Sequence, residues 1–133
     1  MSLGTIEERW TAGDACYLAF WEGRLAHYSW VKSAGAQPVT EADVVIPVKP
    51  GEFWIYHCWT EKWARGRRIY PSVLSSILHD YFVDGCTCGH IYASRTNLAS
   101  QRGIEHAGFR YAYSKWSLRL GSRWYRFPKI SLS

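Results

Sequence analysis

The feature that most constrains the fold is a nearly unbroken apolar and aromatic run at residues 52–60, which a basic stretch and then a helical pattern follow. Such a run is typical of a strand covered on both faces, as in the middle of an α/β sheet. Pro71 suits the first turn of a helix, and Gly85 is placed to end it as the C′ residue. The apolar residues between them have helical spacing: Val73, Leu74, Ile77, Leu78 and Tyr81. A second strand is predicted at 89–94, so the two strands should be parallel with a right-handed crossover.

Hairpins are predicted on both sides of this unit. Residues 15–21 and 24–31 are rich in aromatic side chains and are separated by the turn signal Glu22-Gly23. Residues 34–51 form a long connection with room for a short strand at 44–46. A second helix should begin after the N-cap Asn97 and end at 107–108, and a final hairpin should join 109–120 to 123–127 around 121–122. The order β-β-β-α-β-α-β-β predicts an α/β (α+β) fold, in which helices pack on a mixed, mostly antiparallel sheet with a central parallel strand pair.

The composition indicates one globular domain that spans residues 1–133. Of the 133 residues, 47% are hydrophobic and 20% are charged, which is unlike a disordered chain. No apolar run approaches the roughly 20 residues that cross a bilayer, and no secretory signal opens the chain. We therefore expect a cytoplasmic protein without membrane contact, whose four cysteines stay reduced.

The net charge of +5 is concentrated in one loop, where Lys62, Arg65, Arg67 and Arg68 fall within seven residues. This loop lies between the predicted strand at 52–60 and the start of a helix. The first amides of a helix have no intrahelical partner and the helix dipole adds partial positive charge, so the loop suits an anion such as a pyrophosphate. The other interpretation is a solvated basic loop that binds nothing.

The residues of this loop resemble a motif of the GNAT superfamily of acyl-CoA N-acyltransferases. The family has (Arg/Gln)-x-x-Gly-x-(Gly/Ala) between a strand and a helix, and the amides of this motif bind the pyrophosphate of CoA. Arg65 matches the first position, while Arg68 and Tyr70 stand at the two glycine positions. In some members of the family this loop is similar to Arg-Gly-x-Gly-x-Tyr-Pro, and Tyr70-Pro71 of this chain fits that version of the motif. Arg68 would either crowd the phosphates or bond them through its guanidinium.

A second stretch resembles the same family. GNAT proteins have Asn-x-x-(Ala/Ser) and then Gly-Phe across the exit of the next strand and the helix after it, and this chain has Asn97-Leu98-Ala99-Ser100 and then Gly108-Phe109. Two features depart from the family pattern. The first strand and first two helices of the family have no obvious counterpart here, and Ile104 stands where the family commonly has a tyrosine that protonates the CoA thiolate.

The resemblance implies an N-acetyltransferase that uses acetyl-CoA as co-substrate and acetylates a primary amine. The residues that would hold the pyrophosphate are Arg65 and the amides of Gly66, Arg67, Arg68, Ile69 and Tyr70. The residues that would line the pantetheine arm are Asn97 and the main-chain groups of Cys58, Trp59 and Thr60. An amine must lose a proton before it attacks the thioester, and His57 and Glu61 are the candidate bases. The acceptor would be a small amine, an amino sugar or a peptide, and the aromatic surface would suit a homodimer.

Three other interpretations stay open. The chain could be a degenerate GNAT fold that binds acyl-CoA without catalysis, or binds nothing. A basic, aromatic surface would also suit single-stranded nucleic acid, although no recognition motif supports that. Cys86, Cys88 and His90 are residues of types that bind metals, and they lie within five positions of one another. The paired Cys-x2–4-Cys spacing common in zinc sites is absent, so we expect no metal site.

Overall fold

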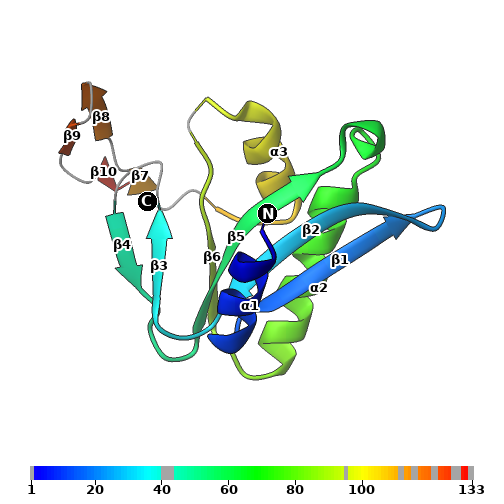
Figure 1. Cartoon of the computed structure of the whole chain (residues 1–133), viewed down its shortest axis with the longest axis horizontal. Coiled ribbons are helices and arrows are strands. Elements are labelled where there is room, and N and C mark those ends of the chain that lie inside the picture. The colour runs from blue at the N-terminus through cyan, green and yellow to red at the C-terminus, as the bar shows by residue number, and fades with distance from the viewer. Residues whose placement is uncertain are drawn as a thin grey trace.

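The structure, a computed structural model, describes residues 2–39, 44–94 and 96–110 and, as backbone only, four short strands between 113 and 131. The main sheet has four strands in the order β1 (Ala15–Trp21), β2 (Arg24–Lys32), β5 (Glu52–Thr60) and β6 (Cys88–Ile91). β5 and β6 are parallel, the other pairs are antiparallel, and helix α2 (Ile69–Val83) packs on one face (Figure 1). The predicted mixed α/β fold is thus confirmed, with β5 and β6 as its parallel pair, although this pair lies at one side of the described sheet and not at its centre.

β1 and β2 form the predicted hairpin. Glu22 and Gly23 both have positive φ, 50° and 78°, as the two-residue turns that match the twist of a hairpin require. Trp21 pairs with Arg24 next to this turn. β2 is buried along most of its length because β5 pairs with its other edge.

β5 has the predicted bounds, and its first half lies at the centre of the core. Residues 53–56 are all buried, and Phe53 stacks on Tyr81 of α2 with ring centroids 4.6 Å apart. The Phe53 ring also lies against Gly89 of β6, where an added Cβ would come within 2.4 Å of a ring carbon. Glycine at this position therefore lets β6 lie close to β5 beneath α2.

The two predicted helices are present. α2 is followed by Gly85 with φ 102°, and α3 (Leu98–His106) begins at Asn97, whose side-chain oxygen accepts from the Ser100 amide at 3.1 Å. The second strand of the crossover is shorter than predicted, because β6 ends at Ile91 and residues 92–94 are not part of a strand. In the described part of the chain, no helix combines the length and apolar character that crossing a bilayer needs.

The N-terminal residues form a helix that the sequence analysis did not predict. α1 (Leu3–Thr11) is capped by Ser2, whose hydroxyl accepts from the Thr5 amide at 3.2 Å. None of its residues is buried, and Trp10 is 68% exposed. The helix therefore lacks the apolar stripe by which sequence patterns reveal helices.

The connection at 34–51 contains a hairpin instead of one short strand. β3 (Ala36–Val39) pairs antiparallel with β4 (Val44–Pro47), and β4 includes the strand predicted at 44–46. Pro38 lies within β3, which is tolerated because each strand of a two-stranded ribbon has an open edge. This proline and the neighbouring loop residues hid β3 from the sequence analysis.

The last part of the chain contains the predicted final hairpin, formed by β8 (Ser117–Leu120) and β9 (Arg123–Arg126). The strand predicted from 109 to 120 is wrong as one element. A separate β7 (Tyr113–Ser114) precedes β8 and pairs with β10 (Ile130–Ser131). The turn predicted at 121–122 lies outside the described residues.

Candidate functional site

β5 and β6 separate halfway along β5. Their pairing runs from Glu52 opposite Cys88 to Ile55 opposite Ile91 and ends there. β5 continues to Thr60 while still paired with β2, and the chain after β6 leads away towards α3 (Figure 1). We call this opening between β5 and β6 the fork. On the side away from β2, residues 56–60 have no strand partner within the described residues, so their backbone groups there can pair with an extended ligand.

A β-bulge at His57 lies at the fork. Between the pairs Trp30–Tyr56 and Tyr28–Trp59, β2 advances by two residues and β5 by three. His57 has a φ of 47°, in the left-handed region that residues other than glycine seldom adopt. A bulge bends its strand and re-aims the side chains beyond it, and the His57 side chain is exposed. The bulge thus coincides with the point where β5 leaves β6.

Two side chains hold the His57 imidazole. Arg9 Nη1 of α1 lies 2.7 Å from His57 Nδ1, and Tyr28 Oη lies 3.3 Å from His57 Nε2. A guanidinium can only donate, so Nδ1 accepts this hydrogen bond and the ring proton belongs on Nε2, which donates to Tyr28. To act as a general base, His57 would have to take a proton at Nδ1, where Arg9 already binds.

Glu61, the other candidate base, directly follows β5 at the same end of the sheet. Its N–H donates to the carbonyl of Ala26 at 2.8 Å, which fixes the residue beside β2. The side chain is half-buried, and its carboxylate has no hydrogen bond within the described residues. Burial raises the pKa of Tyr28, Arg9 lowers it, and the charge of Glu61 raises it, so Glu61 acts on the same tyrosine that contacts His57. His57 therefore contacts the Tyr28 hydroxyl, and Glu61 acts on the same tyrosine through its charge.

The loop between β5 and α2 presents a row of amides. It begins with the 3₁₀ turn η2 (Lys62–Ala64) and continues through Gly66 and Arg68, whose φ angles are 80° and 58°. Left-handed residues directly ahead of a helix turn successive N–H groups to one side, as in anion-binding nests. Within the described chain, the amides of residues 66–70 have no hydrogen-bond acceptor. This row is the feature of the loop that could hold a phosphate group.

The side chains of the loop add positive charge around these amides, because all four of its cations are exposed. The Arg65 guanidinium lies 5.1 Å from the centre of the Trp59 ring, and its Nε donates to the Thr60 carbonyl at 3.1 Å. The Arg67 guanidinium lies 5.1 Å from the centre of the Trp21 ring. Stacking on aromatic faces holds the two arginines beside the loop while their charge stays available to an anion.

Behind the fork, the contacts between β2 and β5 are polar but uncharged. His27 Nδ1 is 2.7 Å from Thr60 Oγ1 and its Nε2 is 2.7 Å from Ser29 Oγ, and burial lowers the pKa of His27 to about 4. Burial also raises the pKa of the Cys58 thiol to about 11. Both groups are therefore neutral at physiological pH, and Cys58 is not activated as a nucleophile. His27 could not be recognised from the sequence, because only the strand register shows that it lies opposite Thr60.

Tyr70 joins the loop to α3. Its ring lies 5.4 Å from that of His27, and its hydroxyl lies 3.2 Å from Ser100 Oγ. A Cβ at Gly103 would come within 2.6 Å of the Tyr70 ring, so the absence of a side chain there lets the two helices meet. Asn97, the remaining predicted site residue, caps this same helix with its side-chain oxygen.

Ile104, at the position where the resembled family has a tyrosine, packs against the core cluster. It offers no hydroxyl, and its packing keeps it as part of the apolar interior. A proton for a leaving group would have to come from elsewhere.

No protein-family model matches this sequence, and no curated protein matches it. Solved structures do match its fold. A putative acetyltransferase from Agrobacterium tumefaciens aligns with a TM-score of 0.64 at 18% identity, over 90% of this chain and 79% of the other. An N-acetyltransferase from Staphylococcus aureus gives 0.65 at 13% identity, over 86% of this chain and 63% of the other. An aminoglycoside N-acetyltransferase in complex with CoA gives 0.62 at 18% identity, over 81% and 77%. Likeness at such identities concerns the fold alone.

Proposed function

Because the chain has the fold of the GNAT acetyltransferases, as its two motifs led us to expect, we propose that it transfers an acetyl group from acetyl-CoA to a primary amine. In this proposal residues 1–133 act as one acyl-CoA-binding domain. Structures with this fold include one named as an aminoglycoside N-acetyltransferase in complex with CoA, which supports the choice of co-substrate. The acceptor is a small amine, an amino sugar or a peptide.

The observation that carries the proposal is the sequence of two features along the chain, the free edge of β5 and then the row of amides. CoA has a pantetheine arm with amide groups at one end of its pyrophosphate. Main-chain groups of Cys58, Trp59 and Thr60 would pair with the arm as a further strand would. The amides of residues 66–70 would hold the pyrophosphate, with Arg65 and Arg68 beside it. Asn97 would lie near the arm on the other side of the fork.

Bound in this way, acetyl-CoA would supply an acyl group that is already activated as a thioester. The chain's part is to position the acceptor and to take its proton. We propose that Glu61 is the base that takes the proton of the acceptor amine. Its carboxylate has no hydrogen bond within the described residues, whereas Nδ1 of His57 already accepts a hydrogen bond from Arg9. His57 would orient the acceptor together with Tyr28. Solvent would protonate the leaving thiolate, since Ile104 cannot.

A second candidate function is acyl-CoA binding without transfer. Two observations favour it: Ile104 packs in the core where a proton donor would be useful, and Arg9 engages His57. This candidate shares the fork and the amide row with the first. It differs from the first only in that no acetyl group is transferred to an amine.

The binding half of the proposal is tested by thermal unfolding with and without acetyl-CoA at fixed salt. At 100 times its dissociation constant, the ligand should stabilise the fold by about 2.7 kcal/mol. Arg68→Ala should weaken this effect, and Lys49→Ala should not, because Lys49 is exposed at the opposite end of β5. ADP lacks the pantetheine arm and should stabilise the fold less. No shift at millimolar acetyl-CoA would refute both candidate functions.

The catalytic half is tested by measuring the release of free CoA thiol with a panel of primary amines. Glu61→Gln should retain acetyl-CoA binding and lower the rate by roughly 100-fold or more, as expected for loss of a general base. Turnover that survives this substitution would refute the role of Glu61. Tight acetyl-CoA binding with no turnover on any amine would favour the second candidate.

A further inference from the structure

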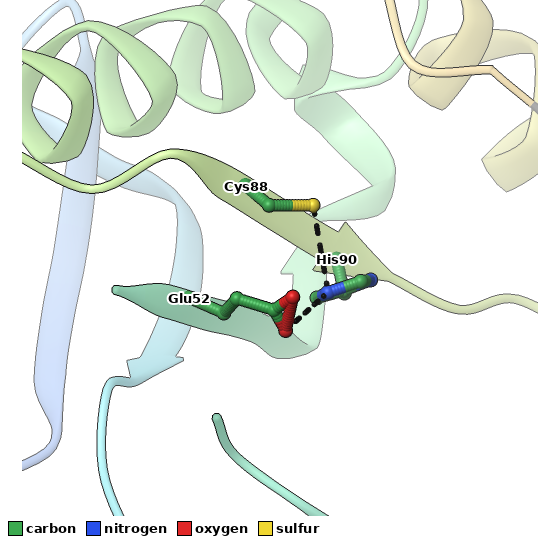
Figure 2. A group of neighbouring side chains, drawn as sticks. All are labelled: Glu52, Cys88 and His90. Atoms are coloured by element: carbon green, nitrogen blue, oxygen red, sulfur yellow. Dashed lines mark hydrogen bonds and ion pairs between the residues drawn. The ribbon is translucent and has the colours of Figure 1, made fainter. Parts of the chain in front are cut away.

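Three side chains of different chemistry converge at the closed end of the β5–β6 pair, away from the fork. His90 Nε2 lies 3.0 Å from Glu52 Oε2 and 3.6 Å from Cys88 Sγ. The three ligand atoms all lie within 4.8 Å of one another. Figure 2 shows Glu52 approaching from β5 and Cys88 and His90 from β6, with one nitrogen of the imidazole facing both the carboxylate and the sulfur.

The register of the parallel strands creates this arrangement. Glu52 lies directly opposite Cys88, and His90 is two residues further along β6. Residues two apart in a strand share a face, so Cys88 and His90 point to the same side of the sheet. Gly89, between them, faces the Phe53 ring and α2 on the other side. The cluster therefore lies on the face that α2 does not cover.

The imidazole is held in place by its neighbour in the sheet. Trp54 is paired with His90 in the register, and the two rings stack with centroids 4.7 Å apart and planes 19° from parallel. Trp54 is itself buried. Stacking on a buried indole orients the His90 ring, so that Nε2 faces the other two side chains.

Two of the three spacings are close to those of a zinc coordination sphere, and the third, between the Cys88 sulfur and the Glu52 carboxylate, lies within 4.8 Å. At tetrahedral angles, zinc bonds of about 2.0 Å to nitrogen and oxygen and about 2.3 Å to sulfur place the ligand atoms roughly 3.3–3.6 Å apart. The distance from His90 to Cys88 already matches, and the distance from His90 to Glu52 would have to grow by only a few tenths of an ångström. The side chains of His90 and Glu52 are 28% and 23% exposed, so an ion could enter from solvent and keep a fourth position for water.

We propose that Glu52, Cys88 and His90 bind one Zn²⁺ ion that clamps the paired ends of β5 and β6. A carboxylate, a thiolate and a neutral imidazole together balance the charge of the ion, and a thiolate favours zinc over magnesium or calcium. Binding replaces the S–H bond of Cys88 with a Zn–S bond and releases the proton to solvent.

The test is a titration of the full chain with Zn²⁺ at neutral pH, in competition with a chelator of known affinity. We expect one ion per chain and a rise in the unfolding temperature. Co²⁺ in place of Zn²⁺ should give a thiolate-to-metal charge-transfer band, which reports sulfur coordination directly. The same titration, followed by calorimetry in buffers of different ionisation enthalpy, should show that the unsubstituted chain releases a proton when it binds zinc.

Matched cysteine variants make the test specific. Cys88→Ser should weaken zinc binding by at least about 100-fold and abolish the cobalt band, since even loss of an outer-shell partner costs 10- to 100-fold. Cys86→Ser should leave both unchanged, because Cys86 packs against the core cluster instead. Glu52→Gln and His90→Gln serve as further ligand variants should Cys88→Ser fail to fold. Absence of stoichiometric zinc, or equal binding by the two cysteine variants, would overturn the proposal.

Discussion

His27 shows how burial alone changes the behaviour of a single residue. It is 1% exposed, and both ring nitrogens lie at hydrogen-bonding distance from hydroxyl groups, with no carboxylate of the described chain bonded to either. Burial lowers its pKa from 6.5 to about 4. The unfolded chain therefore binds a proton more readily than the folded chain between these two values. The free energy of unfolding should fall as the pH falls through this window.

We predict that His27 contributes up to about 3 kcal/mol to the loss of stability between pH 6.5 and pH 4. Urea unfolding across this range, compared between the unsubstituted chain and His27→Gln, measures that contribution as a difference in slope. His79→Gln is the matched control for the loss of an imidazole, because His79 is exposed on α2. Equal slopes in the unsubstituted chain and His27→Gln would contradict the prediction.

Single residues also mark the limit of what the sequence could predict about the site. The basic loop and both candidate bases were identified from residue types and their order. The bulge at His57 could not be, because a histidine within an apolar and aromatic run reads as an ordinary strand residue even though histidine tolerates positive φ better than most side chains. Arg9 could not be connected with His57 either, since the two are 48 positions apart and the helix that carries Arg9 has no buried face.

At the scale of elements, the packing of β6 under α2 depends on Gly89. Gly89→Ala would place a Cβ within 2.4 Å of the Phe53 ring, which is fully buried and stacked on Tyr81. The ring cannot move without disturbing α2, so we expect a loss of about 1–3 kcal/mol in the free energy of unfolding. Chemical denaturation measures this.

Gly4→Ala provides the control for that substitution. No described residue lies within 4 Å of a Cβ at Gly4, and the residue is in the exposed helix α1. Because alanine favours a helix by about 1 kcal/mol over glycine, this variant should be as stable as the unsubstituted chain or more so. A similar loss in both variants would show that contact with Phe53 is not the cause.

The elements differ in how readily their sequence reveals them. β5 and α2 have the apolar patterns that burial imposes, so the bounds of β5 and the span of α2 could be predicted closely. α1 could not, because it buries nothing, and β3 could not, because a proline interrupts its pattern. The fork also escaped prediction, since a strand pattern does not show where a neighbouring strand ends.

At the scale of the whole molecule, three remote segments meet at Asp14. This carboxylate follows α1, accepts a hydrogen bond from the Tyr56 hydroxyl of β5, and pairs with the Lys32 ammonium of β2 at 2.9 Å. The side chain of Asp14 is 2% exposed and that of Lys32 is 15% exposed. The pair thus fixes the end of the N-terminal segment on the sheet.

We predict that Asp14→Asn lowers the free energy of unfolding by about 3 kcal/mol, because it leaves the Lys32 charge nearly buried and unpaired. The measurement is equilibrium unfolding in urea near neutral pH. Asp84→Asn, at the exposed end of α2, should change stability by no more than about 0.5 kcal/mol. A loss as small for Asp14→Asn as for Asp84→Asn would show that the pair is not a stabilising contact.

The zinc cluster also could not be predicted from the sequence, because its residues come from distant parts of the chain. Cys88 and His90 were noted from their spacing, but Glu52 is 36 positions before Cys88 and joins them only through the β5–β6 register. The metal site was therefore not expected from the sequence. Its recognition needed the strand pairing, which no local pattern contains.

The stacking of Arg65 on Trp59 and of Arg67 on Trp21 has an optical consequence. Indole emission depends on the charge and the polarity next to the ring. An anion that draws either guanidinium away from its ring would alter that emission. If the loop binds phosphate-bearing ligands as proposed, these two tryptophans would report the binding as a change in their emission, without a dye or a label.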